Sequence, residues 1–91
     1  MRWCFLLALI AASYPTLSLA AGARCKGEVG LKSIDGTVST SITFANGMPI
    51  PLRVYWVNYQ GDRQFYAVVG PHQSHRQQTY VTHPWIITDE N

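Results

Sequence analysis

The residues of this sequence that could recognise a ligand are mainly aromatic. Trp56, Tyr66 and Trp85 are each expected on a different β-strand, and Thr79 and His83 lie close to Trp85 in the sequence. Two indoles and a phenol can form an apolar slot, while a hydroxyl and an imidazole add directional hydrogen-bonding groups at its rim. This combination suits a ligand that is partly a ring and partly a hydroxyl. The other interpretation is that these aromatic residues are buried sandwich core.

No group of residues predicts catalysis or metal binding. The sequence holds no G-x-S-x-G nucleophile elbow, and Ser74 beside His75 lies in a polar stretch where both side chains are expected to be solvated. Three histidines, His72, His75 and His83, lack a Cys or carboxylate at a helical or hairpin spacing, so they are a weak metal signal. We therefore expect a non-enzymatic protein with no catalytic residue, no metal and no cofactor.

Length and charge limit the classes of protein that fit. The chain has 91 residues with seven Lys and Arg, five Asp and Glu, and a formal net charge of +2. Only one small domain fits this length. The basic residues are scattered along the chain and form no cluster that could neutralise many phosphates, so nucleic acid is not an expected partner.

The first 20 residues have the pattern of a secretory signal peptide. Met1-Arg2 is a short positive start, residues 3–12 are apolar, and Ser18 and Ala20 place small side chains before a cleavage site. We expect cleavage after Ala20, with Ala23 as the second choice. The apolar stretch is too short to span a membrane, so no membrane attachment is expected after cleavage. The sequence predicts a secreted or periplasmic protein.

Cleavage at this site leaves one cysteine in the mature chain. The remaining 71 residues hold six basic and five acidic side chains, and Cys4 is removed with the signal peptide. An odd cysteine in an oxidising compartment usually has a partner outside the visible chain. We therefore expect Cys25 to form a disulfide with a cysteine beyond Asn91.

The mature chain divides into an N-terminal arm, residues 21–38, and a β-rich domain, residues 39–91. Glycines interrupt the arm, in which only residues 28–33 suggest a weak edge strand. Alternating apolar and polar residues predict strands at 37–46, 52–59, 63–69, 74–81 and 84–88, with a hairpin turn at Gln60-Gly61-Asp62 and a tight connection at Thr82-His83. No segment has a helical stripe. The pattern predicts an all-β, antiparallel β-sandwich.

A series of fragments then indicates a family. They are Ile42 to Asn46, Val54 to Gly61, Tyr66, Gly70-Pro71 and Thr79 to Trp85. Asn46 and Trp56 are ten residues apart, Trp56 and Tyr66 are ten apart, and Tyr66 and Thr79 are thirteen apart. In order and spacing the series resembles the β domain of the von Hippel-Lindau (VHL) tumour suppressor family, and more closely its secreted, stand-alone members.

The resemblance implies a specific binding site. In that family a β-sandwich carries a surface pocket for a 4-hydroxyproline of an extended peptide. By resemblance, Trp56, Tyr66 and Trp85 would wall the pyrrolidine ring, and Tyr66 would also reach the peptide backbone. Thr79, where the tumour suppressor has a serine, would share the hydrogen bonds of the ligand hydroxyl with His83. Ring walls alone bind proline and hydroxyproline about equally, so the polar pair would supply the discrimination.

The sequence also departs from the family's pattern. The tumour suppressor continues into a helical domain that recruits a ubiquitin ligase adaptor, and no such segment is present, so no adaptor partner is expected. The family's sandwich continues through a turn glycine, a cysteine and another strand, whereas this sequence ends at Asn91. The resemblance thus implies a C-terminally truncated sandwich, in which the strand at residues 84–88 would be an exposed edge.

These observations predict a secreted, non-enzymatic module that binds extended peptides containing proline or hydroxyproline. One alternative is a structural or general protein-interaction sandwich with no ligand pocket, in which the aromatic side chains are fully buried. A carbohydrate-binding module is a second alternative, because indole faces also stack on sugars. It would need more amide or carboxylate groups than Asn58 and Gln78 provide.

Overall fold

A computed structural model describes residues 4–7 and 24–89 of the chain. Every strand pairing in this part is antiparallel, and none of its residues is helical. This confirms the predicted all-β sandwich, and five strands lie within two residues of their expected bounds. The strands are β1 (Cys4–Leu7), β2 (Ser39–Ala45), β3 (Leu52–Val57), β4 (Arg63–Val69), β5 (Ser74–Tyr80) and β6 (Trp85–Thr88).

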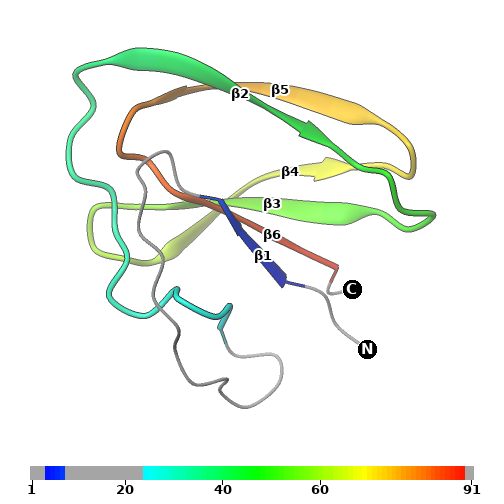
Figure 1. Cartoon of the computed structure of the whole chain (residues 1–91), viewed down its shortest axis with the longest axis horizontal. Coiled ribbons are helices and arrows are strands. Elements are labelled where there is room, and N and C mark those ends of the chain that lie inside the picture. Colours follow the sequence, from blue (N-terminus) through cyan, green and yellow to red (C-terminus); the bar gives the residue numbers. More distant parts are fainter. Residues whose placement is uncertain (1–3, 8–23, 90–91) are drawn as a thin grey trace.

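The strands form two sheets that face each other. One sheet has the order β1-β6-β3-β4, and the other consists of β2 and β5. Figure 1 shows the two-stranded sheet lying over one face of the four-stranded sheet. The chain passes between the sheets at the predicted tight connection, where the His83 amide donates to the Tyr80 carbonyl at 3.1 Å. β5 and β6 are therefore consecutive in sequence but belong to different sheets.

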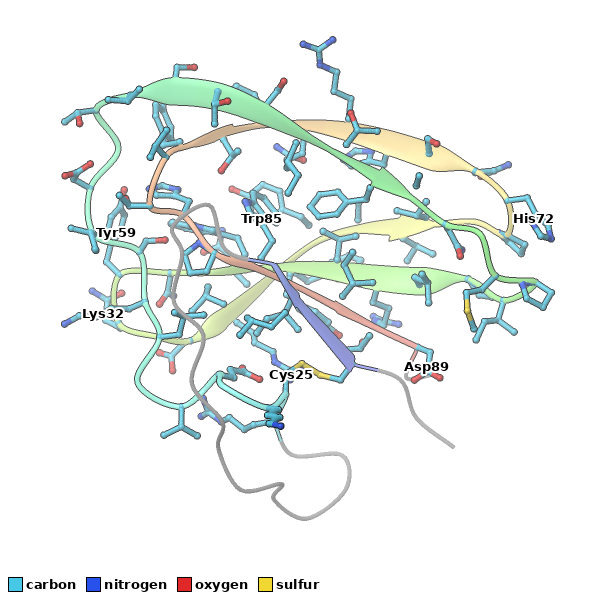
Figure 2. The ribbon with its side chains drawn as sticks, viewed as in Figure 1. Cys25, Lys32, Tyr59, His72, Trp85 and Asp89 are labelled. Atoms are coloured by element: carbon cyan, nitrogen blue, oxygen red, sulfur yellow. A yellow bond between two sulfur atoms is a disulfide. The ribbon has the colours of Figure 1, made fainter. Side chains whose placement is uncertain are left out.

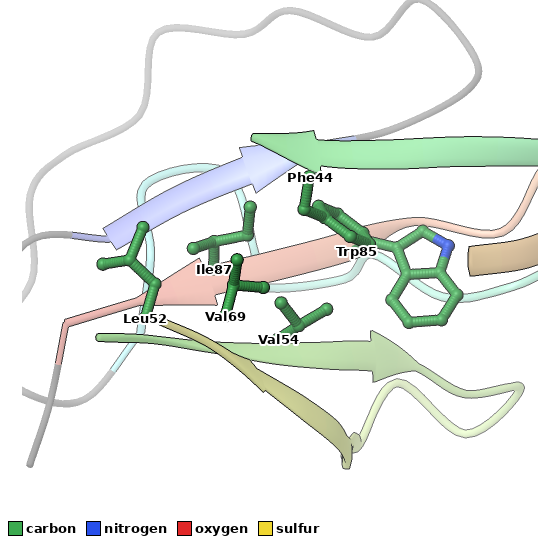
Figure 3. Close-up of a cluster of buried hydrophobic side chains, with 6 residues drawn as sticks. All are labelled: Phe44, Leu52, Val54, Val69, Trp85 and Ile87. Atoms are coloured by element: carbon green, nitrogen blue, oxygen red, sulfur yellow. The ribbon is translucent and has the colours of Figure 1, made fainter. Parts of the chain in front are cut away.

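The main core lies between the two sheets. Strand alternation sends one set of side chains from each sheet inward, and these side chains pack together as Figure 3 shows. The buried cluster consists of Phe44, Leu52, Val54, Val69, Trp85 and Ile87. Burying one large apolar side chain of this kind contributes roughly 1.5–3 kcal/mol to folding. Trp85 belongs both to this core and to the predicted binding site.

The N-terminal arm covers the opposite face of the four-stranded sheet. Cys25 of the arm is buried there with Val57 and Ile86, so all four residues of β6 are buried. The expected edge strand at residues 28–33 is absent. Instead the arm makes two turns, because Gly27 and Gly30 take positive φ values of 82° and 85°, which suit glycine. The arm is therefore an integral layer of the fold.

Cys25 bonds to Cys4, which corrects the prediction that its partner lies beyond Asn91. β1 carries Cys4 and pairs with β6 along its full length, from Cys4 opposite Thr88 to Leu7 opposite Trp85. β6 therefore lies between β1 and β3 and is not the exposed edge that was expected. Figure 2 shows the disulfide beneath the sheet.

Removal of residues 1–20 as a signal peptide remains a prediction about the mature protein. Residues 1–3 and 8–23, which include the expected cleavage site, lie outside the described part. Cleavage there would remove β1 and Cys4 together.

A buried ion pair fixes the arm to β4. Glu28 is almost fully buried and accepts hydrogen bonds from Nε and Nη2 of Arg63, at 2.9 and 2.8 Å. The amide of Cys25 donates to the same carboxylate at 2.8 Å. Burial alone raises the pKa of Glu28, but the hydrogen bonds from Arg63 and Cys25 and the charges of Arg63 and Arg24 outweigh it, so the pKa lies below its ordinary value. Glu28 is thus held as a carboxylate.

Candidate functional site

All five predicted site residues line one cavity. It has a volume of about 220 Å³ and is open to solvent. Its residues come from β3, β4, β5 and β6, from the β3–β4 connection and from the β5–β6 connection. The lining consists of Trp56, Tyr66, Thr79, His83 and Trp85, joined by Tyr59, Gln77, Gln78 and Tyr80.

Aromatic rings form the walls of the cavity. Tyr66 meets Trp85 edge to face with centroids 4.9 Å apart, and meets Trp56 in the same way at 6.3 Å. Trp56 also stacks on the imidazole of His83, at 5.2 Å with 27° between the planes. Such aromatic pairs add roughly 0.5–1.5 kcal/mol each beyond the area that they bury. The walls therefore hold one another in a fixed arrangement.

A β-bulge places Tyr66 in this wall. Val54 of β3 pairs with Ala67, whereas the next residue, Tyr55, pairs with Phe65, so Tyr66 has no partner opposite it. A bulge redirects the extra side chain relative to strict alternation. The ring of Tyr66 consequently reaches Trp56 and Trp85, while Phe65 packs against Tyr55 with the rings at 69°.

A buried hydrogen bond lies at the floor of the cavity. The indole N–H of Trp85 donates to Oγ1 of Thr79 at 3.0 Å, and both residues are only 2% exposed. A hydroxyl has one O–H donor and two acceptor lone pairs. After this bond Thr79 still has its O–H and one lone pair available to a ligand.

His83 is held beside this floor by Tyr59, which the sequence analysis did not single out. The hydroxyl of Tyr59 lies 3.0 Å from Nε2 of His83, and the rings meet edge to face. His83 is 5% exposed, and Tyr80 packs against it with centroids 5.3 Å apart. The signal in the sequence that could have indicated Tyr59 is an aromatic residue directly before the predicted hairpin turn at Gln60-Gly61-Asp62.

The N-terminal arm positions two parts of the site, the indole of Trp56 and the turn that carries His83. Ser33 accepts a hydrogen bond from the indole N–H of Trp56 at 2.8 Å and donates to the carbonyl of Val57 at 2.6 Å. Thr82, which precedes His83 and has φ of 83°, hydrogen-bonds through Oγ1 to the amide and carbonyl of Asp35. A positive φ is strained for a β-branched residue, so these bonds stabilise the turn that presents His83. No local sequence pattern predicts this role of the arm.

The exposure of the five side chains separates the alternatives. Thr79, His83 and Trp85 form a buried floor, whereas Tyr66 is 42% exposed and Trp56 is partly buried at the rim. The set is therefore neither a flat patch nor a fully buried core. A shared open cavity favours a binding module over a sandwich without a pocket.

Of the two amide side chains that could bind the hydroxyls of a sugar, Asn58 and Gln78, only Gln78 lines the cavity. Asn58 does not line the cavity, because its Oδ1 accepts from the amides of Gln60 and Asp62 at 3.0 and 2.9 Å and so closes the β3–β4 turn. Gln78 does line the cavity, but its amide donates to Ser39 and to the Thr79 carbonyl. Few free amide groups remain to satisfy the hydroxyls of a sugar.

The other histidines do not join His83. His72 occupies the turn between β4 and β5, at the end of the sandwich opposite Tyr59 (Figure 2). His75 stacks on Phe44 and bonds to Gln77 through Nε2. Within residues 4–7 and 24–89, no three His, Cys, Asp or Glu side chains are grouped as metal ligands would be. No helix among these residues is long and apolar enough to span a membrane.

Comparison with known proteins identifies the family. No curated protein matches the chain. The VHL beta domain matches residues 31–91, a span that holds the whole cavity and begins inside the arm, before the predicted domain start at residue 39. The strand series, the two-sheet sandwich and the aromatic cavity agree with this match. The chain therefore belongs to the VHL beta domain family.

Proposed function

We propose that this protein is a non-enzymatic module that binds an extended peptide and takes one proline or 4-hydroxyproline ring of it into the aromatic cavity. The VHL beta domain, to whose family the chain belongs, is a protein-interaction module. The single observation that carries the proposal is the open cavity with aromatic walls and the polar floor formed by Thr79 and His83.

The size of the cavity favours one ring of a peptide over a larger ligand. Pockets for drug-sized molecules usually have volumes of about 300–1,000 Å³. At about 220 Å³ this cavity is smaller, and its rings offer both edges and faces to an apolar ring. A pyrrolidine ring is compact enough for this cavity. The backbone of the residue that carries the ring is already restricted in φ, which lowers the entropy lost on binding.

The position of β4 suits the extended backbone of such a peptide. Among the described strands β4 pairs only with β3, so its other edge offers backbone N–H and C=O groups. Tyr66, a wall of the cavity, belongs to this strand, and Phe65 and Val68 on it are exposed. An extended peptide can add to a free sheet edge while one of its side chains enters a neighbouring pocket.

The polar floor supports a preference for hydroxyproline. The remaining O–H and lone pair of Thr79, together with one nitrogen of His83, can satisfy a hydroxyl on the ring. A proline ring leaves these groups buried without partners, at a cost of roughly 1–3 kcal/mol for each unpaired neutral group. One such group corresponds to a preference of roughly fivefold to 150-fold.

The proposed compartment is extracellular or periplasmic. It rests on the signal-peptide pattern of residues 1–20, and it makes an extended segment of a secreted protein the expected partner.

Calorimetry with two matched peptides tests this function. One peptide carries a single 4-hydroxyproline and the other carries proline at the same place. We expect the hydroxyproline peptide to bind the full chain more tightly. Equal affinities would contradict recognition of the ligand hydroxyl by Thr79 and His83. If neither peptide binds at millimolar concentration, the proposal that the cavity binds such peptides is contradicted. Binding of a sugar panel in place of both peptides would favour the carbohydrate alternative.

A further inference from the structure

Tyr59 and His83 form a hydrogen-bonded pair at the side of the cavity that the arm covers. The hydroxyl of Tyr59 lies 3.0 Å from Nε2 of His83, and Tyr59 itself lines the cavity. Tyr59 is 42% exposed, whereas His83 is almost fully buried. The pair therefore joins an accessible phenol to a buried imidazole.

The acid–base properties of the two groups give the bond a direction. A phenol is a fairly acidic O–H donor, with an ordinary pKa of about 10, and the unprotonated nitrogen of a neutral imidazole is a good acceptor. The favoured arrangement is thus O–H of Tyr59 donating to Nε2 of His83. A neutral imidazole carries a single proton, so that proton must then be on Nδ1.

The surroundings fix the ring in this orientation. Trp56 stacks on one side of the imidazole and Tyr80 packs against it from β5. The backbone of Gly36 in the arm lies against the pair, since a Cβ at that position would be 3.1 Å from the Tyr59 hydroxyl and 3.7 Å from Nε2 of His83. Nε2 is thus bonded and shielded, which leaves Nδ1 as the ring nitrogen for a ligand.

We propose that Tyr59 is a specificity-determining residue that holds His83 as its Nδ1–H tautomer, so that the cavity presents an imidazole N–H donor to a ligand hydroxyl. The ligand oxygen accepts from Nδ1 of His83 and donates its proton to the free lone pair of Thr79, whose other lone pair accepts from Trp85. A ring bearing an alcohol satisfies both groups, whereas a ring without one satisfies neither. The identity of the ligand rests on the proposed function, but the tautomer does not.

Nitrogen NMR of the imidazole tests the tautomer in the free protein. At a pH where His83 is neutral, we expect the full chain to show a protonated Nδ1 and an unprotonated Nε2. In Tyr59→Phe the population should shift toward the Nε2–H form that histidine prefers in water. A matched control is Tyr55→Phe, which removes a phenol outside the cavity and should leave the His83 signals unchanged. An Nε2–H tautomer in the unaltered protein, or no shift in Tyr59→Phe, would overturn the proposal, and the first result needs no variant to fold.

Peptide affinities then test the effect on specificity. Tyr59→Phe should reduce the preference for hydroxyproline over proline by roughly fivefold to tenfold, because Phe keeps the ring that lines the cavity and removes only the hydroxyl that holds the tautomer. A parallel loss of both affinities would show that Tyr59 acts only as a wall and would overturn the specificity role. If neither peptide binds the unaltered protein while the tautomer is as expected, the proposed function fails and the Tyr59–His83 assignment stands.

Discussion

The indole N–H of Trp85 donates to Oγ1 of Thr79 at 3.0 Å, in a place where both side chains are 2% exposed. This bond joins the core of the sandwich to the floor of the cavity, because Trp85 packs against Phe44 on one side and Tyr66 on the other. Thr79, the residue that would bind a ligand hydroxyl, therefore also satisfies the buried indole N–H of a core residue.

Thr79→Val should lower both stability and hydroxyl selectivity. The substitution keeps the shape of the side chain but leaves the buried indole N–H of Trp85 without an acceptor, so we expect a loss of roughly 1–3 kcal/mol in the free energy of unfolding. The affinity ratio of the hydroxyproline and proline peptides should fall toward one. Thr79→Ser, which retains the hydroxyl, is the matched control and should keep the ratio. Denaturant unfolding and calorimetry measure the two effects, and an unchanged ratio in Thr79→Val would contradict the role of the hydroxyl.

Ser33→Ala should weaken binding of both peptides equally. The variant removes the acceptor for the Trp56 indole and the donor to the Val57 carbonyl, so the wall formed by Trp56 loses its anchor. Ser33 is buried, and we expect a destabilisation of roughly 1–3 kcal/mol with no change in the preference for hydroxyproline. Ser41→Ala, at an exposed position on β2, is the control and should have little effect. A selective loss of hydroxyproline affinity in Ser33→Ala would place Ser33 in the polar floor instead.

Stability should depend on pH through Glu28. The pKa of Glu28 is lower in the folded chain than its ordinary value of 4.5, so its contribution is fully present above pH 4.5 and is lost as the pH falls through the folded pKa. Glu28→Gln should destabilise the chain at neutral pH, because it removes the carboxylate that pairs with Arg63. Removing one partner of a fully buried ion pair costs roughly 3–5 kcal/mol. The expected loss lies below this range because the Arg63 side chain is 20% exposed. The difference between the two proteins should shrink below pH 4.5. Unfolding curves from pH 3 to pH 7 measure it, with Asp35→Asn as an exposed control, and a constant difference across this range would contradict the assignment.

The N-terminus of the exported protein should be Ala21. The signal-peptide pattern predicts cleavage after Ala20, which removes Cys4 and leaves Cys25 without the partner that it has in the full chain. Intact mass and thiol labelling of the exported protein measure both properties, and Cys4→Ser serves as a reference for a full chain without this disulfide. An exported protein that retains residues 1–20 with Cys4 bonded to Cys25 would contradict the predicted cleavage.

The strands could be predicted because their signal is local. Alternation at Val54 and Trp56 against Tyr55 and Val57 sends the two pairs to opposite faces of the sheet, where the structure has them. The bulge at Tyr66 could not be predicted in this way, since it depends on which residues of β3 and β4 face each other.

The contribution of the arm was missed because it consists of contacts that are distant in sequence. Ser33 and Trp56 are 23 residues apart, and Glu28 and Arg63 are 35 apart. Neither pair leaves a periodic pattern, and the glycine content of the arm suggested a segment with little structure. The Cys4–Cys25 bond of the full chain was missed for a different reason, because Cys4 was assigned to a signal peptide and was not considered as a partner.

Titration of the full chain with the hydroxyproline peptide, followed by proton–nitrogen NMR, tests whether the peptide ring enters the aromatic cavity. We expect the indole N–H signals of Trp56 and Trp85 and the ring nitrogen signals of His83 to shift together, and the proline peptide to produce smaller shifts at the same concentration. Shifts confined to the outer face of the four-stranded sheet, around Tyr55 and Phe65, or no shifts with either peptide, would contradict it.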